Sequence, residues 1–117
     1  MLRTDLTLDV RGVDFGTMDL QFSYFQFLND VNVVQSILKA TKEGYHGVAA
    51  GCVCDSGVHL ARGVTDIPIG GLAESGMLAA CLYGRTFCIL TYAREEGAKR
   101  IEDLIRLYRK SKGSTKT

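Results

Sequence analysis

Apolar and polar positions follow two different periods in the first part of the chain. Residues 6–15 alternate one by one, which predicts a strand with one covered face. From residue 30 to residue 44 the apolar side chains recur at helical spacing, with Asp30 as the N-cap and Gly44 as the stop. Residues 16–29 fit neither period, so we expect a loop that leads into this helix.

Beyond residue 45 short apolar runs and longer helical patterns take turns. The expected strands are 46–53, 66–71 and 85–92, and the helices that follow them are 56–65, 72–84 and 94–110. Such alternation requires right-handed crossovers and therefore predicts an α/β fold, an open and mainly parallel sheet with helices on both faces, like a flavodoxin-like single lobe. The last helix is amphipathic and gathers on one face Ala98, Ile101, Leu104, Ile105 and Tyr108.

Length and composition are those of a globular protein. The chain has 117 residues, of which 46% are hydrophobic and 23% charged, enough for one domain with its own core. We expect one lobe over residues 1–110 and a disordered basic tail over residues 111–117, whose polar composition cannot form a core.

Charge and hydropathy narrow the set of partners. The net charge is +1, divided into −3 over the first 93 residues and +4 from Arg94 onward. The basic end is typical of a solvated helix face with a tail, so we expect no nucleic-acid partner. No apolar run approaches the roughly 18 residues of a membrane span, and the acidic start does not resemble a signal peptide. Four cysteines without a secretory signal then indicate free thiols in the cytoplasm.

The cysteines do not follow the spacing of a metal or a redox centre. They stand at positions 52, 54, 81 and 88, so no pair has two residues between its members. His46 and His59 do not complete a zinc pattern, and we expect both to be surface or capped histidines and the chain to bind no metal. Cys81 lies within a predicted helix and Cys88 within a predicted strand, so both are expected in the core.

The ends of the predicted parallel strands locate a candidate site. Ligands of such sheets bind outside the carboxyl ends of the strands, which here are residues 51–56, 70–71 and 91–92. A helix that follows Asp55 would direct its N–H groups at the same space, where they favour an anion and stabilise a thiolate. Residues 51–56 are therefore a candidate cradle for a small carboxylate or imide beside an activated sulfur, that of Cys52.

Structural roles explain the same residues equally well. Free cysteines are often buried, and Asp55 is an ordinary N-cap for the next helix. Gly70 and Gly71 are also typical of a turn. Glu74 is either a first-turn carboxylate or a site residue, and Arg62 is expected at the surface or in a structural ion pair rather than on the substrate.

The middle of the chain, residues 44–91, resembles the Asp/Glu/hydantoin racemase superfamily, and hydantoin racemases in particular. The resemblance rests on the order and spacing of several elements rather than on any one of them. These are Cys52, Asp55, Gly57, Arg62, the run Ile67–Ile69, Gly71, Glu74 and Thr91.

This resemblance implies cofactor-independent proton transfer at a carbon next to a carbonyl. Cys52 would be the thiolate base, and Cys54, Asp55, Ser56, Gly71, Glu74 and Thr91 would surround the substrate. Members of the superfamily have two similar lobes, each with a catalytic cysteine, whereas this chain shows one lobe. We therefore expect a homo-oligomer or a partner that supplies the second lobe.

Three functions remain open at this point. The first is a racemase or isomerase of a small amino-acid derivative, of the hydantoin or Asp/Glu type. The second is a lyase or isomerase of the same superfamily that uses Cys52 alone, of the decarboxylase or maleate isomerase type. The third is a catalytically incomplete lobe that binds a small anion or forms oligomers.

Overall fold

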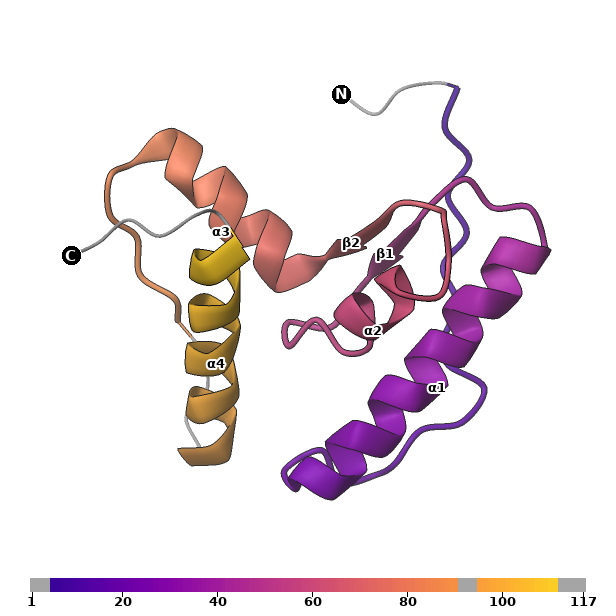
Figure 1. Ribbon diagram of the computed structural model, residues 1–117, viewed down its shortest axis with the longest axis horizontal. Helices are drawn as coiled ribbons and strands as arrows, with labels where there is room; N and C mark the ends of the chain where they lie inside the picture. The colour runs from indigo at the N-terminus through magenta and orange to yellow at the C-terminus, as the bar shows by residue number, and fades with distance from the viewer. Residues whose placement is uncertain (1–4, 91–94, 112–117) are drawn as a thin grey trace.

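The computed structural model describes residues 5–90 and 95–111 as an α/β structure (Figure 1). The elements in chain order are α1 (Ser23–Lys42), β1 (Val48–Ala50), α2 (Val58–Arg62), β2 (Ile69–Gly71), α3 (Leu72–Tyr83) and α4 (Glu95–Ser111). Figure 1 shows the two strands between α1 on one side and α3 with α4 on the other. The predicted fold class is confirmed, although the sheet that the described residues form is small.

The sheet consists of β1 and β2, which pair in parallel. Val48 lies opposite Ile69 and Ala50 opposite Gly71, and α2 makes the crossover between the strands. The carboxyl ends of both strands therefore lie at one edge of the sheet. Residues 51–56 leave β1 there, and β2 continues directly into α3.

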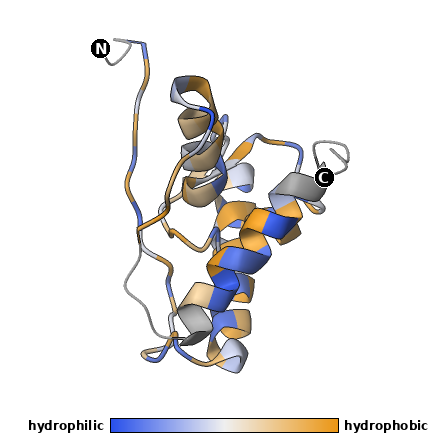
Figure 2. Cartoon of the chain, turned by 90° about the vertical axis from the view of Figure 1, so that its left-hand side faces the viewer, coloured by the Kyte–Doolittle hydropathy of each residue, from blue (hydrophilic) through white to orange (hydrophobic). Residues whose placement is uncertain are grey.

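The core lies where α1, α2 and the two strands meet. Its buried side chains are Ile37, Val58, Ala61 and Ile69, against which the partly buried Val33, Val34, Val48 and Ala50 pack. In α4, Ile101 and Leu104 are buried and the other three residues of the predicted apolar face are partly buried, which confirms that face. Figure 2 views α4 from outside, where hydrophilic residues lie beside hydrophobic ones.

The predicted strand over residues 6–15 is wrong. The segment is extended, but no strand among residues 5–90 and 95–111 lies beside it, so its alternating apolar side chains face solvent and Val10 is 90% exposed. Alternation defines a strand only where a neighbour pairs with it. The segment is held instead by Arg11, which forms an ion pair with Glu43 and lies over the ring of Tyr45.

Helix α1 begins at Ser23, earlier than predicted. Phe22 is its N-cap and offers no side-chain hydrogen bond, while Gln26 bonds the Leu20 carbonyl and so stabilises the first turn. Asp30 is therefore an interior residue of α1 rather than its cap. Gly44 follows the helix end with φ +87, a conformation that favours glycine, so the predicted stop is confirmed.

The predicted strand over residues 85–92 is also absent where the structure describes it. Residues 85–90 form no regular structure, and residues 91–92 lie outside the described part. Cys81 and Cys88 are both exposed, so their expected place in the core is wrong. The carboxyl end of α3 projects from the rest of the molecule, as Tyr83 at 91% exposure shows. Within the described residues, no strand lies beside the segment that follows it.

Two further expectations concern the tail and membrane-spanning helices. Ser111 ends α4, and the rest of the predicted tail lies outside the described residues. None of the helices in the described part is long and apolar enough to cross a membrane.

Candidate functional site

The loop between β1 and α2 brings the two candidate thiols together in one turn. The Asp55 N–H donates to the Cys52 carbonyl across 2.9 Å, which closes a four-residue turn over Cys52, Val53, Cys54 and Asp55. Asp55 itself has φ +49, the left-handed conformation that aspartate tolerates better than most residues. Both sulfurs are only partly buried, so they lie within reach of a ligand at the edge of the sheet.

Hydrogen bonds within this turn separate the two thiols in acidity. The Cys54 thiol donates to the Cys52 sulfur, and the Ser56 hydroxyl donates to it across 3.6 Å. These bonds stabilise the Cys52 thiolate and lower its pKa to about 5, against the opposing effect of burial. The same bond from Cys54 to Cys52, together with burial, raises the pKa of Cys54. The turn therefore favours the thiolate at Cys52 and the protonated thiol at Cys54.

Asp55 caps α3, not α2 as predicted. Its carboxylate accepts hydrogen bonds from the Ala73 N–H and the Glu74 N–H, both at 2.8 Å, and α2 has Gly57 as its N-cap instead. Tyr108 of α4 donates its hydroxyl proton to the same carboxylate. Asp55 is 4% exposed, so it joins the turn to two helices from a buried position.

Gly71 is required by the approach of this carboxylate. A Cβ atom at Gly71 would lie 2.6 Å from each of the two Asp55 oxygens, closer than such atoms pack. Glycine at this position lets the turn after β1 close against the start of α3. The packing of Gly71 against Asp55 thus brings together two of the predicted strand ends, residues 51–56 and residues 70–71.

Glu74 and Arg62 form an ion pair beside the site. Their charged groups approach to 2.5 Å, and the Arg62 guanidinium also donates to the Ile69 carbonyl through two nitrogens. Arg62 therefore has the structural role that was expected. Glu74 lies in the first turn of α3, where the negative charge of its carboxylate interacts favourably with the helix dipole. Thr91, the remaining candidate, lies outside the described residues.

Sequence patterns did not reveal the residues that connect α4 to the site. Tyr108 was expected only as part of an apolar face, yet its hydroxyl contacts both Asp55 and the ring of His59. Arg100 of α4 bonds Asp30 of α1, which also accepts the Gly57 N–H. These partners are far apart along the chain, so local spacing gave no signal of them.

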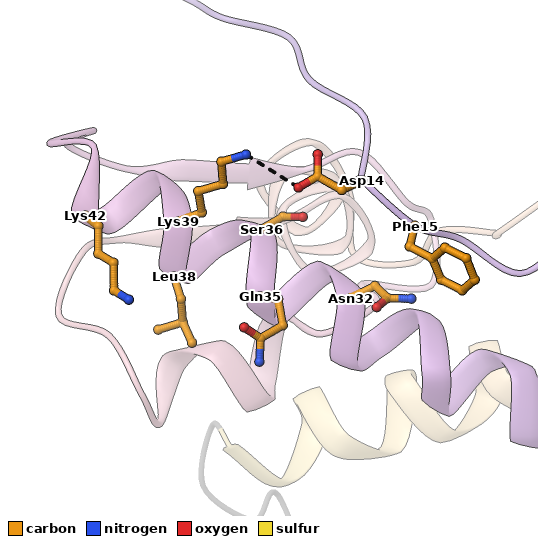
Figure 3. A pocket seen from close by; sticks show the side chains of 8 residues that line it. All are labelled: Asp14, Phe15, Asn32, Gln35, Ser36, Leu38, Lys39 and Lys42. Carbon is orange, nitrogen blue, oxygen red and sulfur yellow. Dashed lines mark hydrogen bonds and ion pairs between the residues drawn. The ribbon is translucent and has the colours of Figure 1, made fainter.

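One surface pocket lies away from the thiols. It is a depression of about 350 Å³ where residues 14–15 pass over α1, lined mainly by polar side chains such as Gln35 and Lys39 (Figure 3). An apolar pocket of about 260 Å³ between α3 and α4 includes Val53 among its lining residues, which places it next to the turn. Over residues 5–90 and 95–111, no three side chains of the metal-ligating types are grouped to hold an ion.

Comparison with known proteins shows the family of the chain. Residues 27–112 match the family described as Asp/Glu/Hydantoin racemase. The chain belongs to the Asp/Glu/hydantoin racemase family. This racemase-family chain is also 30% identical, over 89 residues, to a hydantoin racemase of Pseudomonas sp. (strain NS671). The match covers 76% of the chain and 36% of that relative, so it spans about a third of the relative's length. No solved structure matches the chain.

Proposed function

We propose that the chain carries one catalytic cysteine of a cofactor-independent racemase or isomerase that acts on a hydantoin or an amino-acid derivative. The Cys52 thiolate removes the proton from the carbon beside the substrate carbonyl. The observation that supports this role is the low pKa of Cys52, which the hydrogen bonds from Cys54 and Ser56 produce. A thiol at its ordinary pKa near 8.5 would be mostly protonated at neutral pH.

The surroundings of Cys52 fit the removal of a proton from the substrate. Removal of the proton leaves an enolate whose charge lies on the carbonyl oxygen, and N–H or O–H donors stabilise such an oxygen. The Ser56 hydroxyl lies at this end of the sheet, and the apolar pocket beside Val53 offers a water-poor surface. The substrate class follows the family and the hydantoin racemase that the chain resembles.

Proton exchange in heavy water tests the proposal. The full chain is incubated with an enantiopure hydantoin, and loss of the α-proton is followed by NMR together with optical rotation. Cys52→Ser is expected to lower the exchange rate about 100-fold or more, the scale of a general base. Cys88→Ser is the matched control because that thiol is exposed and is expected to leave the rate unchanged. Exchange no faster than in buffer, or a fully active Cys52→Ser, would refute the proposal.

The position of Cys54 favours a second candidate, exchange from one face only. Cys52 and Cys54 belong to the same turn and contact each other, so both would approach a substrate from one side. Racemisation needs a proton delivered to the opposite face, whereas a lyase or one-base isomerase does not. Deuterium incorporation with retained optical rotation would identify this one-face reaction, and loss of rotation in step with incorporation would identify the racemase.

A further inference from the structure

Cys52 and Cys54 are close enough in the chain to form a covalent bond. Two residues span at most about 7 Å when the backbone is extended, and the turn closed by the Asp55 N–H and the Cys52 carbonyl makes the separation shorter. Disulfides join Cα atoms that are about 4.4–6.8 Å apart. The Cys54 side chain is also the largest cause of the lowered pKa of Cys52, which supports the nearness of the two sulfurs.

Access and chemistry distinguish this pair from the other two cysteines. Both sulfurs in the turn are partly buried rather than enclosed, so a small oxidant can reach them. Cys52 also has the Ser56 hydroxyl as a donor, which favours the reactive thiolate. The Cys88 thiol, by contrast, donates to the Ile89 carbonyl.

We propose that Cys52 and Cys54 are a modification site at which a hydroperoxide forms a disulfide within the turn. The Cys52 thiolate attacks one oxygen of hydrogen peroxide and breaks the O–O bond, which leaves a Cys52 sulfenic acid and releases hydroxide. The Cys54 sulfur then attacks the Cys52 sulfur and displaces the hydroxyl group, which leaves as water with the Cys54 proton. The released hydroxide takes up the proton that Cys52 lost on ionising, so that in total two thiols lose two electrons to one peroxide, which is reduced to two water molecules.

The disulfide would stop proton exchange at the site, a consequence that rests on the proposed function of Cys52 as the base. A sulfur bonded to Cys54 has no thiolate to accept a proton, so exchange stops. A ring closed over one intervening residue is strained, and strained disulfides are easily reduced. The modification is therefore expected to be reversed by a dithiol.

Trypsin separates the cysteines for a direct test. Cleavage after Lys42, Arg62, Arg85 and Arg94 gives peptide 43–62 with Cys52 and Cys54, peptide 63–85 with Cys81, and peptide 86–94 with Cys88. The full chain is treated with hydrogen peroxide, its remaining thiols are alkylated, and the masses of its tryptic peptides are measured by mass spectrometry. We expect peptide 43–62 to lose about 2 Da, for the two hydrogen atoms, roughly tenfold faster than the other two peptides are oxidised, and to regain them in dithiothreitol.

The variant Cys54→Ser removes the second sulfur and keeps nearly the same size. Its peptide 43–62 is expected to gain one oxygen, about 16 Da, and to be trapped by dimedone as a sulfenic acid. This peptide contains no methionine, so the oxygen is assigned to cysteine without ambiguity. If the variant does not fold, the wild-type peptides still provide the comparison.

Three results would overturn the proposal. They are a wild-type peptide 43–62 that gains oxygen without losing hydrogen, a disulfide that joins it to another peptide, and oxidation no faster than that of Cys88. The masses require no substrate, so they stand even if no hydantoin is exchanged. If exchange is present, it is expected to disappear with the 2 Da loss and to return with the dithiol, and exchange that persists in the disulfide form would refute control of the site.

Discussion

Asp55→Ala is expected to destabilise the chain strongly, because this one carboxylate holds three donors from two helices. The substitution leaves the Ala73 and Glu74 N–H groups and the Tyr108 hydroxyl without their common acceptor. Loss of the helix cap costs about 1–2 kcal/mol, and loss of the hydrogen bond from Tyr108 to the charged group adds about 1.5 kcal/mol. The expected decrease in the free energy of unfolding is thus about 3 kcal/mol, a large part of the roughly 5–15 kcal/mol of a typical domain.

Urea unfolding of the full chain, followed by circular dichroism under reducing conditions, measures this decrease. Asp14→Ala is the matched control because the Asp14 side chain is 83% exposed and its ion pair with Lys39 is 3.4 Å long, so less than about 0.5 kcal/mol is expected. Asp55→Asn keeps the shape and the left-handed backbone but not the charge, so about half of the alanine effect is expected. If Asp55→Ala changed the free energy no more than Asp14→Ala, the buried carboxylate would not join the elements as argued.

Two further predictions concern the glycines and the acidity of Cys52. Gly57→Ala is expected to lower the free energy of unfolding by about 3 kcal/mol, because φ is +70 and the new Cβ would lie 2.8 Å from the Asp30 carbonyl oxygen. Gly76→Ala, whose new Cβ would have nothing within 4 Å, is expected to raise it by about 0.5–1 kcal/mol. Equal effects of the two substitutions in urea unfolding would contradict the backbone argument. Alkylation of Cys52 by iodoacetamide is expected to fall only as the pH drops through about 5, since the lowered pKa keeps the thiolate above that value. In Cys54→Ala, which removes the donor at position 54, the midpoint is expected to move upward, toward the roughly 8.5 of a free thiol. A wild-type midpoint near that value would show that the turn does not stabilise the thiolate.

Local patterns predicted those elements whose neighbours are also local. The strand, helix and strand from β1 to β2 lie within 24 residues, from Val48 to Gly71, and the short apolar runs with their glycines marked all three. The carboxyl-end rule then pointed to the turn that contains Cys52. The apolar face of α4 was predictable for the same reason, because helical spacing alone defines it.

Patterns failed where a distant partner decides the outcome. The alternating residues 6–15 and the apolar residues 85–90 have strand-like sequences, but the described residues provide no strand beside them. Asp30 and Asp55 both looked like caps of the next helix, and both bind elements that lie elsewhere in the chain. A single sequence contains no information about which distant donor will meet a given carboxylate.

Helix α4 has a consequence for the order in which the chain folds. Arg100 reaches Asp30 and Tyr108 reaches Asp55, across 70 and 53 residues respectively, whereas β1 pairs with β2 over a short loop. Closing a long loop costs more entropy than closing a short one, so the β1–α2–β2 unit is expected to form before α4 docks. During synthesis from the N-terminus, the turn with Cys52 is made well before the tyrosine that fixes its aspartate, and the site reaches its final shape only when α4 arrives.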